Sequence, residues 1–288
     1  MSAAPLVAPH QRARGTARIA VERRDGRSRL ADLHQSGCLR LRLPRTGDPA
    51  PVGTLINTAG GLTGGDRLAI EARVGDGAAL TLTTQSAEKL YRAGDGHAGV
   101  DVSLSVGSGG RLAWLPRETI LFEGSALRRT LHLDAAPDAR VLLVEAWVAG
   151  REAMGESLAR CDVLDRWRVR VGGALVHAEA LRLPPDDTAR WLAAPGGWAG
   201  VRALATVLLI APEAPVLVPA ARTIAGDAGA VDAWDAAPAP RLVARLAAPN
   251  HIALYRRLAR LLALLNREGL GLGMGDDPRQ ALPLTWSV

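Results

Sequence analysis

Apolar and polar residues alternate with a period of two from about Thr54 to Leu183. The clearest runs are LTLT at 80–83, VDVSLSV at 100–106 and RWRVRV at 166–171. Because successive side chains of a β-strand point to opposite faces, this period predicts strands with one face on a core and the other toward water.

Glycine-rich turns separate these runs. They are GDG at 75–77, GDG at 94–96, GSGG at 107–110 and GG at 172–173. Short alternating strands divided by such turns predict a mainly β fold with many short antiparallel strands. The segments share no fixed period or recurring motif, so no repeat architecture is predicted.

The C-terminal third changes from strand-like to helical patterning. Asn250 is a good N-cap, Gly269 is a good stop, and the residues between them predict one main helix over 250–268. Its apolar stripe is Ile252, Tyr255, Leu258, Leu261, Leu262 and Leu265. The stripe predicts a helix packed on the β body, and a partner-docking helix is the alternative. We expect one domain over 1–288, with a flexible tail at 1–15.

Basic residues give the chain a formal net charge of +6, and Lys89 is the only lysine among 35 basic residues. Dispersed arginine is typical of a genome that favours arginine codons; an acidic partner or nucleic acid is the alternative. The two cysteines are far apart and exclude a zinc module. No apolar run reaches the length of a membrane span, the longest being 203–211. A cytoplasmic protein is expected.

The segment NTAGGLTGGDR at 57–67 contains two glycine pairs. A phosphate-binding Walker loop needs Lys and then Ser or Thr after its last glycine, but Asp66 and Arg67 follow here. A dinucleotide fingerprint should open a helix, whereas this segment runs into the alternating LAIEARV. The glycines therefore predict a tight backbone crossing between strands, with Asp66 projecting at its end, and no nucleotide site.

Four carboxylates, Asp66, Glu118, Glu145 and Glu156, lie in distinctive local sequences. Glu145 interrupts the apolar run VLLVEAWVA, which predicts that it is at least partly buried. A buried carboxylate needs an ion pair, for example with Arg151, or a bound cation. A pair of carboxylates for glycoside hydrolysis is a further alternative. No G-x-S-x-G nucleophile motif is present.

Four segments together resemble the urease accessory protein D family, also called UreD or UreH. They are NTAGGLTGGDR, LTLTTQSAEKLYRA, WLPRETILFEGSAL and LLVEAWVAGREAMGE, in that order over about residues 55–158. Arg117 departs from the glutamine expected in its block, and on an exposed strand end this change should alter partner contacts without altering the fold. The glycine block also reads NTA where many relatives carry proline.

The resemblance implies a non-catalytic protein with a coiled, stacked β arrangement and a small C-terminal helical part. It implies a scaffold that binds apo-urease, the helical accessory protein UreF and, through it, the GTPase UreG. No cofactor is expected to be bound permanently. Nickel is expected to pass transiently, and GTP only through a partner. Neither membrane nor nucleic acid is expected as a partner.

A nickel conduit should offer carboxylates and hydroxyls, since imidazole and thiolate ligands hold nickel strongly. We therefore expect Asp66, Glu118, Glu145 and Glu156 along a transient nickel path, with Thr83 and Thr84 in the same polar passage. Two other functions stay open from the sequence, namely a β-rich hydrolase with paired carboxylates and an arginine-mediated nucleic-acid binder.

Overall fold

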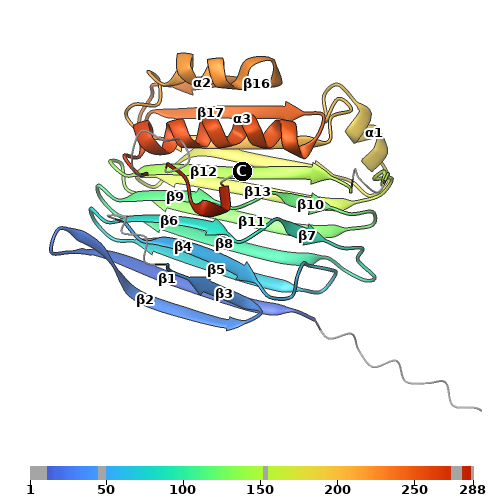
Figure 1. The fold of residues 1–288 in the computed structure, drawn as a ribbon, viewed down its shortest axis with the longest axis horizontal. Helices are drawn as coiled ribbons and strands as arrows, with labels where there is room; N and C mark the ends of the chain where they lie inside the picture. The colour runs from blue at the N-terminus through green and yellow to red at the C-terminus, as the bar shows by residue number, and fades with distance from the viewer. Residues whose placement is uncertain (1–11, 45–49, 152–154, 274–280, 287–288) are drawn as a thin grey trace, which may run out of the picture.

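Two sheets stacked face to face form the body of the computed structural model, which describes residues 12–44, 50–151, 155–273 and 281–286 (Figure 1). In spatial order, sheet A contains β14 (Ala174–Leu183), β13 (Asp162–Val171), β11 (Ala126–Ala135), β8 (Ala98–Val106), β5 (Arg67–Val74), β1 (Arg14–Arg24) and β2 (Arg27–Gly37). Sheet B contains β16 (Gly229–Trp234), β17 (Arg241–Ala248), β15 (Ala203–Ile210), β12 (Arg140–Ala149), β9 (Arg111–Leu115), β6 (Ala79–Thr84), β4 (Val52–Asn57) and β3 (Leu39–Arg42). Two short strands, β10 (Thr119–Leu121) and β7 (Glu88–Leu90), extend sheet B beside β12.

The chain winds as a coil that passes repeatedly from one sheet to the other. The turns after β5, β8 and β11 each lead from sheet A into sheet B, to β6, β9 and β12. Each new strand therefore lies beside the strand of the previous coil and runs in the same direction, as β5, β8, β11 and β13 do. The mainly β, coiled and stacked fold is confirmed.

The antiparallel pairing predicted from the sequence is wrong for the centre of both sheets. It holds at the margins, where β1 pairs β2, β13 pairs β14, and β15 pairs β12 and β17. Period-two alternation reports which face is buried and carries no information on strand direction. The glycine turns at 75–77, 94–96 and 107–110 cross between sheets instead of closing hairpins, and this makes the central pairs parallel; only the turn at 172–173 closes a hairpin, between β13 and β14.

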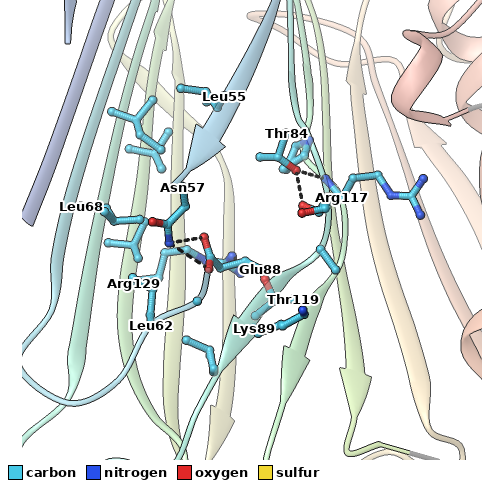
Figure 2. Close-up of a pocket in the computed structure, with 18 of the residues that line it drawn as sticks. Leu55, Asn57, Leu62, Leu68, Thr84, Glu88, Lys89, Arg117, Thr119 and Arg129 are labelled. Atoms are coloured by element: carbon cyan, nitrogen blue, oxygen red, sulfur yellow. Dashed lines mark hydrogen bonds between the residues drawn. The ribbon is translucent and has the colours of Figure 1, made fainter. Parts of the chain in front are cut away.

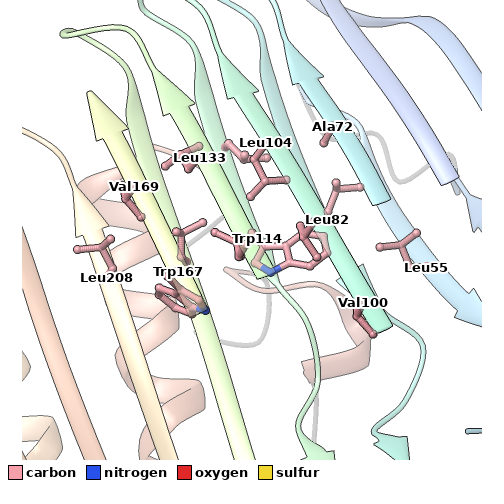
Figure 3. Close-up of a cluster of buried hydrophobic side chains, with 14 of the residues drawn as sticks. Leu55, Ala72, Leu82, Val100, Leu104, Trp114, Leu133, Trp167, Val169 and Leu208 are labelled. Atoms are coloured by element: carbon pink, nitrogen blue, oxygen red, sulfur yellow. The ribbon is translucent and has the colours of Figure 1, made fainter. Parts of the chain in front are cut away.

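The main core lies between the sheets. Figure 3 shows Trp114 and Trp167 among leucines and valines that the alternating runs direct inward, such as Leu82, Leu104 and Val169. Burial of these apolar side chains is the main stabilising contribution to the sandwich. The pattern from Thr54 to Leu183 thus identified the inner faces, although β1 and β2 precede it.

A second core lies on the outer face of sheet B, beneath α2 (Val218–Ala225) and α3 (His251–Leu264). The Asn250 side chain caps α3 by accepting a hydrogen bond from the Ala253 N–H, and a π-turn over Leu265–Gly269 ends the helix at the predicted glycine. A short helix, α1 (Thr188–Ala193), and 3-10 turns at Gly226–Ala228 and Leu284–Trp286 complete the helical part.

Two details of the predicted termini are corrected. Ile252 is 63% exposed and lies off the buried stripe, which includes Leu254 instead. Leu254, in the same first turn, faces the second core, so Ile252 lies on the opposite side of the helix and is left in solvent. Arg14 and Gly15, expected in the flexible tail, begin β1, where parallel pairing with β5 orders them. Residues 1–11 of that tail lie outside the described residues.

Candidate functional site

A cavity of about 170 Å³ lies between the sheets, where β4 and β6 end and β7 begins (Figure 2). Most of its wall is apolar and comes from both sheets, including Leu55, Leu68 and Trp114. Its polar lining residues are Asn57, Thr84, Gln85, Ser86, Glu88, Lys89, Arg117, Thr119, Arg129 and Glu145. A concave, largely apolar space that contains polar groups is the usual form of a ligand site.

Glu88 points from β7 toward Asn57 in this cavity (Figure 2). The Asn57 amide donates to both carboxylate oxygens, at 3.1 and 3.2 Å. Burial raises the pKa of Glu88 to about 7, because the hydrogen bonds from Asn57 compensate only part of the lost hydration. No arginine or lysine of the described residues forms an ion pair with it.

Glu145 and Asp165 share one cation, Arg129. The Arg129 guanidinium lies 2.9 Å from a carboxylate oxygen of Glu145 and 2.9 Å from one of Asp165. It also stacks 4.5 Å above the ring of Trp147. Burial raises the pKa of Glu145 to about 8; the charge of Arg129 opposes this shift and the nearby charge of Asp165 adds to it. Two buried carboxylates with one arginine favour a proton on Glu145.

The arginine partner of Glu145 differs from the one expected. Glu145 is buried, as the interrupted apolar run predicts, but it pairs with Arg129 from sheet A and not with Arg151. Arg151 binds Glu156 at 3.0 Å. The pairing with Arg129 crosses the space between the sheets, and sequence separation gives no access to such contacts.

Thr84 is the other predicted residue that lines the cavity. Its hydroxyl accepts a hydrogen bond from the Arg117 N–H at 2.8 Å and donates to the Ser86 carbonyl at 3.0 Å. Thr83 points to the opposite face of β6, where its hydroxyl bonds that of Thr285. The period of two therefore separates these neighbours, and only Thr84 belongs to the cavity.

Asp66, Glu118 and Glu156 lie outside the cavity wall and have structural partners. Asp66 does not project; it is buried and accepts hydrogen bonds from the N–H groups of Ala13 and Thr63, at 2.8 Å each. Glu156 accepts hydrogen bonds from the N–H groups of Glu123 and Arg151. Both side chains shape loops, since their oxygens satisfy backbone donors that no strand pairs.

Glu118 binds Arg117 and His251, each at 3.1 Å. Although burial opposes ionisation, the hydrogen bond from His251 and the charge of Arg117 lower the pKa of Glu118 to about 2. Glu118 therefore joins the loop before β10 to the start of α3.

Arg117 is not on an exposed strand end. Its guanidinium lies 4.4 Å from the ring centre of Tyr255 and 5.1 Å from that of Trp286, and it donates to the Thr285 carbonyl. The Trp286 indole N–H donates in turn to the Leu115 carbonyl at 2.9 Å. Arg117 thus anchors the C-terminal turn over sheet B, a structural role that the sequence did not indicate.

The glycine segment 57–67 crosses from β4 in sheet B to β5 in sheet A. Gly60, Gly61 and Gly65 have φ values of 75°, 149° and 90°, a region that favours glycine. A Cβ on Gly64 would collide with the Asp95 carbonyl oxygen. The segment needs glycine for backbone shape and close approach, in agreement with the interpretation as a crossing.

The sequence did not single out two residues that line the cavity, Glu88 and Arg129, or Asp165, which pairs with Arg129. Two of these three carried a usable signal. Arg129 lies on the face of Leu127, Leu131 and Leu133, and Asp165 lies on the face of Val163, Trp167 and Val169. A charged residue on the apolar face of an alternating run marks a buried charge.

Over the part of the chain that the structure describes, no group of three or more His, Cys, Asp or Glu side chains is arranged to hold a metal ion. In that same part, every helix is too short or too polar to cross a membrane.

Comparisons with known proteins identify a family. The family model described as "UreD urease accessory protein" matches residues 13–279. The urease accessory protein UreD of Brucella suis is 44% identical over 283 residues, which cover 98% of this chain and 97% of the relative. The UreD of Mesorhizobium japonicum is 44% identical over 279 residues, covering 96% and 95%.

Proposed function

The chain belongs to the UreD family of urease accessory proteins, and from this premise we propose that it is a non-catalytic scaffold in urease maturation. It binds apo-urease in the cytoplasm, together with the helical protein UreF and, through UreF, the GTPase UreG. The observation that carries the proposal is the match to UreD proteins over nearly the whole chain. GTP is bound by the partner.

Nickel is the cargo in this proposal, and the cavity between the sheets is part of its passage. Glu88, Glu145 and Thr84 offer oxygen ligands there, which bind nickel less tightly than imidazole or thiolate groups. Arg129 already occupies Glu145, so the site is not preorganised to keep a cation. This combination supports transient contact. The other four residues expected along the path lie outside the cavity, and we do not include them in the proposed passage: Asp66, Thr83, Glu118 and Glu156.

The passage is tested by nickel delivery to urease. We expect Glu145→Gln and Glu88→Gln, singly and together, to lower both the nickel content of co-expressed urease and its urea hydrolysis. The complex with apo-urease should stay intact in a pull-down. Glu71→Gln is the matched control, since Glu71 is on sheet A and pairs with Arg18 at the surface. Normal nickel content in the double variant would contradict the passage.

The scaffold itself is tested separately. Cells that lack this chain should make urease with little nickel, and the wild-type chain should restore it. Full urease activity without the chain would contradict the proposed function.

The α3 and C-terminal region is our proposed docking site for UreF. Ile252 is 63% exposed and Leu284 is 84% exposed, and contacts of Arg117 and Glu118 tie both segments to the same loop. Deletion of 269–288 would also remove Trp286 from the Arg117 stack. Ile252→Asp and Leu284→Asp are therefore sharper tests, and both should weaken co-purification with UreF while Val216→Asp should not.

The hydrolase alternative gains no support from the cavity. Two-carboxylate hydrolysis needs one ionised group beside a protonated one. Arg129 engages Glu145 in an ion pair and the Asn57 amide holds both oxygens of Glu88, so neither carboxylate is free to act on a substrate.

A further inference from the structure

The outer face of sheet A carries a cationic strand that the proposed function does not use. On β13, Arg166, Arg168 and Arg170 alternate with the buried Trp167 and Val169. The three arginines therefore project from the same face at intervals of about 7 Å. In the described ranges the helices α2 and α3 pack on sheet B, so this face of sheet A is open to solvent.

The neighbouring strands leave these guanidinium groups uncovered. On one side, β14 places Ala180 beside Arg166 and Ala178 beside Arg168. On the other side, β11 places Thr130 beside Arg166 and the exposed His132 beside Arg168. These neutral neighbours add no opposing charge beside Arg166 and Arg168, and the one carboxylate in register with the row is Asp134, beside Arg170.

Most carboxylates on this face already have partners. Asp162 is bound by both Arg128 and Arg182, at 2.7 and 2.6 Å. Asp101 accepts the Thr130 hydroxyl at 2.6 Å, and Glu71 pairs with Arg18.

The arginines of β13, by contrast, form no ion pair with any described carboxylate, although Asp134 lies beside Arg170 in register. Arg168 and Arg170 each donate only to a backbone carbonyl.

We propose that the β13 arginine row binds an acidic, extended segment of a partner protein whose carboxylates recur at every second residue. In an extended segment such carboxylates have the same spacing of about 7 Å as the arginines, so each can accept charge-assisted hydrogen bonds from one guanidinium. The inference concerns an interaction surface and stands independently of nickel transfer.

A protein segment fits this face better than nucleic acid does. The cationic row is one strand wide, and Asp101, Asp134 and Asp162 lie on its flanks, where a polyphosphate chain would be repelled. The outward positions of β11 and β13 contain no Phe, Tyr or Trp, and His132 is the one ring there on which a base could stack.

The test measures binding of a fluorescent peptide of alternating Glu and Ser to the purified full chain at low ionic strength. We expect binding that salt weakens, and a loss of about tenfold or more in the variant Arg166→Gln/Arg168→Gln/Arg170→Gln. The matched control Arg14→Gln/Arg29→Gln/Arg73→Gln removes the same charge from β1, β2 and β5 and should bind as the wild type does.

Three results would overturn the proposal. They are no binding by the wild type, an equal loss in both triple variants, and tighter binding of a single-stranded oligonucleotide than of the peptide. The circular dichroism spectrum of each variant verifies that it is folded, since all six arginines are on the surface of sheet A and leave the core unchanged.

Discussion

Single buried charges carry most of the chemistry of this molecule. Glu145, Asp165 and Arg129 form a cluster with two acids and one base, and Glu88 is held by the Asn57 amide without an ion pair to any described residue. Burying such groups is unfavourable unless they are paired or neutralised. The charged groups of the cavity are therefore only partly compensated, and stabilising the fold is not their main role.

Loss of the shared cation should be the most damaging change in this cluster. Arg129→Met leaves two buried carboxylates without a base, and we expect a loss of about 3–5 kcal/mol in the free energy of unfolding. Glu145→Gln leaves the Arg129–Asp165 pair intact and should cost about 1 kcal/mol or less, since the carboxyl already favours its proton. Urea titrations of both variants compare the two losses. Equal losses would contradict the shared-cation description.

Glu88 should make stability depend on pH. Burial raises its folded-state pKa from the ordinary 4.5 to about 7, so the folded protein holds this proton more tightly than the unfolded chain does. The resulting stabilisation is complete below about pH 4.5 and is lost as the pH rises through 7; at most it is about 3 kcal/mol. Between pH 5 and pH 8 the free energy of unfolding should fall less in Glu88→Gln than in the wild type. If it fell equally in both proteins, Glu88 would not be the source of the pH dependence.

What the sequence could predict at the residue scale follows from the same charges. The burial of Glu145 is predicted because this residue interrupts an apolar run. Arg129 and Asp165 interrupt the apolar faces of alternating strands in the same way, so their burial could also be predicted. The pairing of Arg129 with Glu145 was not, because it joins strands of different sheets and depends on how the coil closes.

At the scale of elements, the turn that links β4 to β5 depends on glycine for close backbone approach, a requirement that Gly94, in the turn between β7 and β8, does not share. Gly64 lies against the Asp95 carbonyl, whereas Gly94 has open space and ordinary backbone geometry. Gly64→Ala should lower the free energy of unfolding by about 2 kcal/mol or more through the forced backbone shift, and Gly94→Ala should change it by about 0.5 kcal/mol or less. Thermal unfolding of the two variants compares these losses. A Gly64→Ala variant as stable as Gly94→Ala would mean that the crossing has room for a Cβ atom.

The C-terminal turn is a second dependent element. Arg117→Gln removes the cation stacked on Tyr255 and Trp286 together with its hydrogen bond to Thr285. We expect faster amide hydrogen exchange at residues 281–286 and a loss of about 1–2 kcal/mol in stability. Exchange unaltered at Trp286 would show that the indole–Leu115 hydrogen bond suffices alone. Local sequence predicted the helix before this turn, but not the arginine that anchors the turn.

The direction of the strands was the main element-scale error. Alternation and glycine turns identified the strands and their buried faces correctly. Hairpins and sheet-changing crossings use the same residues, because both need positive φ and close approach. A hairpin and a crossing can be distinguished only by which strand lies beside each strand once the coil has formed.

At the scale of the whole molecule, one apolar core runs from β1 to β15 between the sheets. It includes Ala17 near one end and Leu208 near the other, with Trp114, Trp147 and Trp167 between them. We expect a single cooperative unfolding transition in which tryptophan fluorescence and far-UV circular dichroism coincide. Two separate transitions would show that the chain has two domains instead of the one expected from the sequence.

Spatial order in both sheets follows the order of synthesis, apart from the hairpin partners at the margins. A chain leaving the ribosome can thus add each coil to the finished one before it, with no strand waiting for a distant partner. The α3 helix and the Trp286 turn follow all the strands in the chain and complete the cover over the outer face of sheet B. A chain in which only the strands and α2 have formed therefore exposes apolar surface of that face, and this intermediate is the one most prone to aggregation.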